Sequence, residues 1–121
     1  MEERAQLLSE FLDAIDAPVI VEGVKDREAL EALGVREVVQ LNRGGSILSA
    51  VESLQGFKSA IILTDLDQEG KILRKKIIEY FGLYGIQENP RPREILARMK
   101  FSHVEGLRCM IHDEEILIAS E

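Results

Sequence analysis

The sequence predicts an α/β fold with a mainly parallel, four-stranded sheet and helices on both faces of that sheet. Three short apolar runs, at residues 19–21, 38–41 and 60–64, have the composition of strands that are buried on both sides. Each run ends in polar or glycine-rich residues, and an amphipathic helical pattern follows it. This alternation of strand and helix is typical of parallel strands that are joined through helices.

Length and composition indicate one globular domain over residues 1–121. The chain is 45% hydrophobic and 31% charged, which is typical of a globular protein rather than of a disordered segment. Cys109 is the only cysteine, so neither an intrachain disulfide nor a cysteine zinc cluster can form. No apolar run approaches the roughly 20 residues that span a bilayer, and the first segment is polar and acidic. We therefore expect a cytoplasmic protein with no membrane partner.

The first part of the chain is predicted to form a helix, a strand and a second helix. Residues 4–15 carry an apolar stripe at helical spacing, which is typical of a packing helix. Glu22 directly follows the strand at 19–21, and a carboxylate at the end of an apolar strand needs a partner. A helix over residues 26–33 follows, and Asp26 at its start is predicted to be its N-cap rather than part of a site.

The next strand, at residues 38–41, leads into a glycine-rich loop. Ser46 is predicted to be the N-cap of the helix that follows this loop. Two interpretations of the loop stay open. It is either ordinary turn chemistry or a place where a phosphate approaches backbone N–H groups at a helix N-terminus. The residues that would bind that phosphate are Arg43, Gly44 and Gly45.

Acidic residues gather directly after the strand at 60–64. Asp65, Asp67 and Glu69 follow one another at every second position and are closed by Gly70. In an extended stretch, positions i and i+2 project to the same side, so the two aspartates can converge on one cation. Glu22 leaves its strand at the same edge of the sheet, so if the two strands are neighbours, Glu22, Asp65 and Asp67 could share one metal site. Oxygen ligands favour Mg²⁺, with Mn²⁺ as the second choice. The alternative is that one aspartate only caps the next helix.

Basic residues cluster after this acidic stretch although the whole chain has a net charge of −7. Residues 71–100 contain 8 Lys and Arg against 3 Asp and Glu, a local net charge of +5. Such a basic block could attract the phosphates of a nucleic acid and guide them towards a cation bound by the acidic residues. The alternative is that the basic residues only form a solvated helix face. The residues expected to contact phosphates are Lys71, Arg74, Lys75, Arg91, Arg93 and Arg98.

The remaining elements are predicted from periodicity and turn residues. Residues 71–84 have the pattern of a long amphipathic helix, and residues 89–93 that of a stiff, proline-containing loop. A short helix should follow, and residues 101–107 with 109–111 are predicted to supply the last strand. The two histidines, His103 and His112, lack metal-ligand spacing and are assigned surface or packing roles.

Two motifs at strand ends resemble the Toprim domain. The first is Glu22-Gly23-x-x-Asp26 after the first strand, and the second is Asp65-x-Asp67-x-Glu69-Gly70 about forty residues later. The first motif is similar to that of bacterial primases and of a ribosomal-RNA maturation nuclease, and the second to that of type IA topoisomerases. The likeness covers residues 18–85, with the N-terminal helix and a basic and C-terminal segment over 86–121 outside it. The chain most resembles the small stand-alone Toprim proteins of archaea and bacteria.

The resemblance implies a site and a function. Glu22 would serve as general acid or base, Asp65 and Asp67 would hold Mg²⁺, and Glu69 would assist directly or through water. The expected function is Mg²⁺-dependent phosphodiester or phosphoryl-transfer chemistry on RNA or DNA, with nuclease activity favoured. The alternative is a non-catalytic module that binds metal and nucleic acid and acts with a protein partner.

Overall fold

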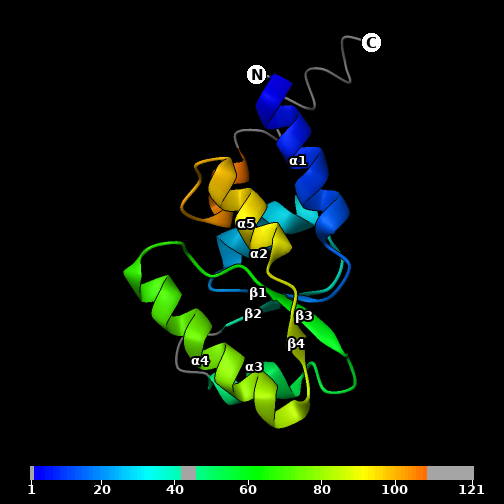
Figure 1. Cartoon of the computed structure of the whole chain (residues 1–121), viewed down its shortest axis with the longest axis vertical. Coiled ribbons are helices and arrows are strands. Elements are labelled where there is room, and N and C mark those ends of the chain that lie inside the picture. The colour runs from blue at the N-terminus through cyan, green and yellow to red at the C-terminus, as the bar shows by residue number, and fades with distance from the viewer. Residues whose placement is uncertain (1, 42–45, 109–121) are drawn as a thin grey trace.

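The computed structural model describes residues 2–41 and 46–108. Within these residues, one sheet is formed by β1 (Val19–Val21), β2 (Val38–Gln40), β3 (Ser59–Ile62) and β4 (Gln87–Glu88). All pairings are parallel and the strand order is β2-β1-β3-β4, so β1 and β3 lie in the middle (Figure 1). The predicted four-stranded parallel sheet is therefore confirmed.

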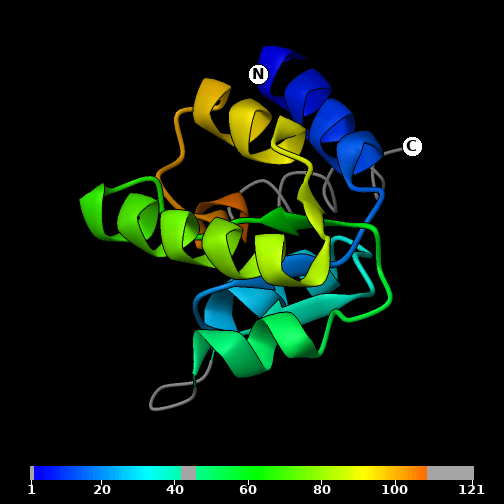
Figure 2. The ribbon, with the colours of Figure 1, turned by 60° about the horizontal axis from the view of Figure 1, so that its bottom comes forward.

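Helices cover both faces of this sheet, as predicted (Figure 2). One face packs against α1 (Glu2–Ala14), α2 (Val24–Ala32), α5 (Arg91–Arg98) and the short 3₁₀ helix η1 (Val104–Leu107). The other face packs against α3 (Ile47–Glu52) and α4 (Gln68–Tyr84). Among the described residues, no helix is both long and apolar enough to cross a bilayer.

Successive strand side chains enter two separate cores because neighbouring residues of a strand point to opposite faces. Val19 and Val21 belong to the core shared with α1, α2 and α5. Ile20, between them, packs into the other core with Ile77 and Phe81 of α4. All three β1 side chains are 0% exposed. The central strands are thus fixed from both sides, and so is the sheet edge at which their carboxyl ends meet.

The fourth strand is not the one predicted from the sequence. Residues 104–107 form η1 instead of a strand, and residues 109–111 lie outside the described part of the chain. The fourth strand is β4, which pairs with β3 through the N–H of Gln87 to the Lys58 carbonyl at 2.9 Å. A polar edge strand of two residues has no apolar pattern, so only its backbone pairing defines it.

Two helix boundaries also differ from the prediction. The expected loop at 89–93 is shorter, because α5 already begins at Arg91. Pro92 fits there because a helix leaves its first N–H groups unbonded. On the sheet's other face, α4 begins at Gln68 rather than at residue 71, because Asp67 caps it.

Candidate metal and nucleic-acid site

Glu22 and Asp65 lie next to each other at the carboxyl edge of the sheet. Their strands are neighbours, with Ile20 opposite Ile62, and each acid follows its strand by one or a few residues. The backbone N–H of Asp65 donates a hydrogen bond of 2.6 Å to Oε2 of Glu22. The expectation that Glu22 leaves the sheet at the same edge as the Asp65 loop is confirmed.

Asp67 is the N-cap of α4, so the capping alternative holds for this residue. Its Oδ1 accepts a hydrogen bond of 2.8 Å from the Gly70 N–H, and its backbone is extended as an N-cap requires. Glu69 lies in the first turn of α4 and is exposed. The helix N-terminus favours this negative charge. Capping uses one oxygen of Asp67, so it does not conflict with a second role for the carboxylate.

The predicted convergence of three carboxylates on one ion is not seen in this conformation. Over residues 2–41 and 46–108, no group of three acidic, histidine or cysteine side chains is arranged to ligate a metal. What the structure does bring together is the pair of Glu22 and Asp65. The Asp67 carboxylate instead turns back to its own helix.

The acids at this edge repel one another. The pKa of Asp65 is raised from 3.8 to about 6, first by burial and then by the charges of Glu22, Asp26 and Asp67. His103 opposes this shift. A carboxylate whose ionisation is disfavoured by neighbouring negative charge gains stability when a cation binds beside it.

Asp26 belongs to this acidic group, contrary to the prediction that it only caps a helix. Gly23 is the N-cap of α2, and Asp26 lies three residues later with its Oδ2 accepting the Gly23 N–H at 3.3 Å. Its Oδ1 accepts the N–H of Glu105 at 3.1 Å, which joins α2 to η1. Asp26 is 8% exposed, and burial raises its pKa, partly offset by these hydrogen bonds and by His103.

His103 is a site residue that sequence reasoning missed. Its charge lowers the pKa of both Asp26 and Asp65, so it lies near each of them. The segment before η1 is held there by the Leu66 N–H, which donates to the Ser102 carbonyl at 2.6 Å. No sequence spacing connects a histidine near residue 100 with acids at 26 and 65. Only the folded chain brings the charge of His103 near these acids.

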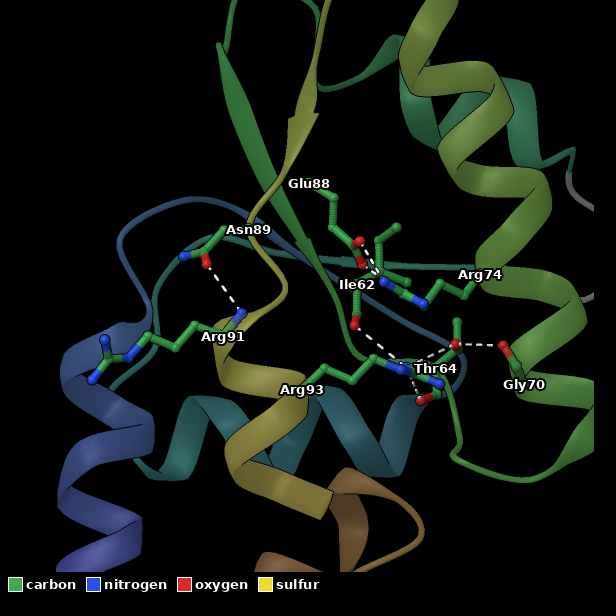
Figure 3. Close-up of polar contacts among 8 residues, drawn as sticks. All are labelled: Ile62, Thr64, Gly70, Arg74, Glu88, Asn89, Arg91 and Arg93. Atoms are coloured by element: carbon green, nitrogen blue, oxygen red, sulfur yellow. Dashed lines mark hydrogen bonds and ion pairs between the residues drawn. The ribbon is translucent and has the colours of Figure 1, made fainter. Parts of the chain in front are cut away.

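Arg93 has a different role from the predicted phosphate contact. Its side chain is 7% exposed and extends along the end of β3 (Figure 3). Nη1 donates to the Thr64 carbonyl at 2.6 Å, to Thr64 Oγ1 at 3.2 Å and to the Ile62 carbonyl at 3.4 Å. Nη2 donates to the Asp65 carbonyl at 2.8 Å. A buried guanidinium with these partners cannot reach a nucleic acid, so this expectation was wrong.

The first turn of α4 closes against the same carbonyl of Asp65. A Cβ on Gly70 would overlap the backbone of Asp65, so only glycine fits there. Thr64 Oγ1 donates to the Gly70 carbonyl at 2.7 Å, and the Thr64 side chain is fully buried. The Asp65 carbonyl therefore lies between the start of α4 and the Arg93 guanidinium.

Two further basic residues are paired with acids. Arg74 makes a bidentate ion pair with Glu88 of β4, with contacts of 2.7 Å from Nε and 2.6 Å from Nη2 (Figure 3). Arg98 bonds Glu10 of α1 at 3.0 Å on the surface. These pairs compete with any phosphate for the same guanidinium groups.

The other predicted nucleic-acid contacts differ in where they lie. Lys71 and Lys75 are exposed in the first two turns of α4, close to the acids. Arg91 is exposed, but in Figure 3 it points away from the Arg93 cluster towards α1. There it borders a hollow with the acids Glu10, Asp13 and Asp16, which disfavour an approaching phosphate. Arg43, Gly44 and Gly45 lie outside the described residues.

Comparison with known proteins identifies the family. The Toprim domain model matches residues 17–99, which is more than half of the chain, so the chain belongs to the Toprim domain family. It is 35% identical to a UPF0292 protein of Pyrococcus abyssi over 97 residues, covering 79% of this chain and 73% of that protein. It is 40% identical to a UPF0292 protein of Thermococcus kodakarensis over 105 residues, covering 80% and 77%. A solved structure from Aquifex aeolicus is similar, with a TM-score of 0.73 and 26% identity, over 84% of this chain and 95% of that one.

Membership of the Toprim family implies a metal-dependent role in nucleic-acid chemistry or binding, with Mg²⁺ as the expected ion. The donor chemistry of this edge fits Mg²⁺. Its side chains are carboxylates, and the raised pKa of Asp65 reflects negative charge that a cation would offset. Mg²⁺ commonly binds through one or two carboxylates together with water and substrate phosphates, so three converging protein ligands are not required.

Proposed function

We propose that this Toprim protein cleaves phosphodiester bonds in nucleic acid with the help of Mg²⁺. The observation that carries the proposal is the contact between Glu22 and the Asp65 loop at the carboxyl edge of adjacent central strands. Parallel α/β sheets place their ligands at this edge. The grouped carboxylates there suit a cation, and phosphodiester cleavage needs both a cation and a group that moves a proton.

The side chains divide these tasks between them. Asp65 and Asp67 would hold the ion, with Glu69 acting directly or through water. When bound, Mg²⁺ neutralises phosphate charge and makes a water molecule a better nucleophile. Glu22 would be the general acid or base, since its carboxylate lies beside another acid and is oriented by the Asp65 N–H.

Lys71 and Lys75 would guide the substrate. They lie within two turns of the Asp67 cap on the exposed side of α4, so a backbone bound along them would pass the acids. Local positive charge of this kind attracts phosphates even on a protein with a net charge of −7.

A second candidate function is a metal- and nucleic-acid-binding module that needs a protein partner for turnover. The observation that favours it is the internal use of Arg74 and Arg93, which bind Glu88 and the end of β3. These contacts reduce the basic surface that would grip a substrate. A partner would then supply the missing cations.

Purified protein incubated with end-labelled RNA, single-stranded DNA and supercoiled plasmid, with and without Mg²⁺, tests both candidates. Nuclease function predicts cleavage that requires Mg²⁺ and is lost in Asp65→Asn and Glu22→Gln. Binding of any of these substrates without Mg²⁺-dependent cleavage would select the accessory module. The absence of both binding and cleavage would contradict both candidates.

A further inference from the structure

A buried cation lies directly behind the acidic edge. The guanidinium of Arg93 reaches from α5 on one face of the sheet to the end of β3. Its acceptors are three backbone carbonyls, of Ile62, Thr64 and Asp65, and the Thr64 hydroxyl. All four are neutral, whereas a buried guanidinium is usually paired with a carboxylate.

The charge of Arg93 interacts with the site although its hydrogen bonds do not go to the acids. Burial is the main influence on Arg93 and lowers its pKa, and the charge of Arg74 acts in the same direction. The charges of Glu88, Glu22 and Asp65 act in the opposite direction. Since guanidinium stays protonated in proteins, Arg93 contributes a permanent positive charge near Glu22 and Asp65.

The same group controls the geometry of the loop that carries the aspartates. Nη2 holds the Asp65 carbonyl, while Nη1 holds Thr64, whose hydroxyl binds the Gly70 carbonyl in α4. The Gly70 N–H in turn binds Asp67. The chain of contacts therefore runs from Arg93 through the loop to both aspartates.

We propose that Arg93 is the positioning residue of the site, which holds the loop from Thr64 to Gly70 in place before a metal binds. This inference rests on the proposed function, because positioning matters only if the carboxylates bind a cation. Mutation of a residue that orients metal ligands without touching the metal typically costs about 10–100-fold in metal affinity.

Metal affinity provides the first test, with Arg93→Met compared with wild type and with Arg98→Met as control. Both arginines are on α5, but the Arg98 side chain is 59% exposed and pairs with Glu10 at the surface. Binding of Mn²⁺ is followed through the EPR signal of the free ion, at a temperature where circular dichroism shows each variant folded. We expect Arg93→Met to weaken Mn²⁺ binding by about 10–100-fold, because displacing the ligands costs more affinity than removing a nearby positive charge gains. We expect Arg98→Met to bind as wild type does.

Amide hydrogen exchange without metal provides the second test, and it separates positioning from a general loss of stability. In Arg93→Lys, an ammonium group cannot reproduce the forked contacts of the guanidinium. Protection should fall at the Asp65 and Gly70 amides, which bind Glu22 and Asp67. It should persist at Ile77, in the middle of α4. Arg93→Lys also serves as the variant for the Mn²⁺ titration if Arg93→Met does not fold.

The outcomes distinguish this inference from the proposed function. If wild type binds Mn²⁺ and the folded Arg93 variant binds it equally well, the positioning role is refuted and the proposed function survives. If wild type binds no Mn²⁺, the proposed function is refuted, and the exchange data alone decide whether Arg93 holds the loop. A uniform loss of protection that includes Ile77 would show that Arg93 only stabilises the fold.

Discussion

The N–H of Asp65 and the carboxylate of Glu22 form a hydrogen bond of 2.6 Å between residues 43 positions apart in the chain. This bond connects the ends of β1 and β3, which are neighbours in the middle of the sheet. The hydrogen bond orients the carboxylate of Glu22 and brings Asp65 close to it. Burial, and then the charge of Glu22 that this contact brings close, make the ionised state of Asp65 unfavourable.

Asp65 should reduce the stability of the metal-free protein at neutral pH. Its pKa in the folded state, about 6, is above the ordinary 3.8, so the folded protein binds this proton more tightly than the unfolded chain does. The resulting stabilisation is fully present below pH 3.8 and is lost as the pH rises through about 6. At pH 7, Asp65→Asn should therefore be more stable than wild type by about 1 kcal/mol, after allowance for solvent screening.

Thermal melts of both proteins between pH 4 and pH 7, in the presence of a chelator, measure this difference. The difference should shrink towards pH 4. Glu79→Gln, at an exposed position on α4, controls for the removal of one negative charge elsewhere. Equal melting temperatures of Asp65→Asn and wild type at pH 7 would show that neither burial nor the neighbouring acids disfavour its charge.

Gly70→Ala should be strongly destabilising, since the added Cβ would overlap the Asp65 backbone. Backbone atoms cannot move aside as a flexible side chain can, so we expect a loss of about 3 kcal/mol or more. Urea unfolding of the variant measures this loss.

Gly82→Ala is the matched control on the same helix. A Cβ at Gly82 would meet open space, and alanine is the better helix former. This variant should gain about 0.5–1 kcal/mol. A Gly70→Ala variant as stable as Gly82→Ala would mean that the loop is not held against α4 as described.

Asp67 combines a cap with a proposed metal ligand, and two substitutions separate these roles. Asp67→Ala removes both and should cost about 1 kcal/mol of stability without metal. Asp67→Asn keeps an N-cap oxygen and should be nearly as stable as wild type in a chelator. Wild type should gain about 2.7 kcal/mol when Mg²⁺ is present at 100 times its dissociation constant. Differential scanning calorimetry should show a smaller Mg²⁺-induced gain in stability for both variants. A gain in Asp67→Asn equal to that of wild type would show that Asp67 is not a metal ligand.

Substrate binding and turnover should depend on different residues. Replacing Lys71 and Lys75 by alanine should weaken nucleic-acid binding and reduce the slope of log affinity against log salt by about 0.7–0.9 for each lost phosphate contact. Arg91→Ala is the control, because Arg91 points away towards α1 and borders acidic residues (Figure 3). Fluorescence anisotropy over a salt series measures both. An unchanged slope in the double variant would assign these lysines to a solvated face.

Glu22→Gln should leave binding intact and lower the cleavage rate by about 10²–10⁴-fold, the usual cost of losing a general acid or base. Single-turnover cleavage with saturating protein separates this effect from affinity. A variant that cleaves as fast as wild type would remove Glu22 from the chemistry.

The parts of the fold that could be predicted are those marked in the sequence by apolar strand patterns or by characteristic turn residues. The apolar runs that became β1, β2 and β3 are recognisable because both faces of a central parallel strand are buried. Ser46 was correctly predicted as an N-cap, since its hydroxyl accepts the Ser49 N–H at 3.0 Å. The juxtaposition of Glu22 and Asp65 also followed from the rule that parallel strands share a carboxyl edge.

Features that depend on long-range contacts could not be predicted in this way. β4 is defined by backbone pairing, and its residues are polar. Nothing in the local sequence distinguishes Arg93 from its exposed neighbours Arg91 and Arg98. Arg93 is buried because α5 packs against the sheet. His103 comes near Asp26 and Asp65 only in the folded chain, after a turn at Lys100 whose φ is 65°.

The order of the strands has a consequence for synthesis of the protein. β1 is central, yet both of its partners, β2 and β3, come later in the chain. A growing chain therefore exposes the apolar strand β1 on at least one side until residue 62 has been synthesised. The Asp65 loop gains its contacts with Arg93 and Ser102 only after those later residues have been added. A product that stops at β4 would contain every acid of the motif without the contacts from α5 and η1 that hold their loop in place.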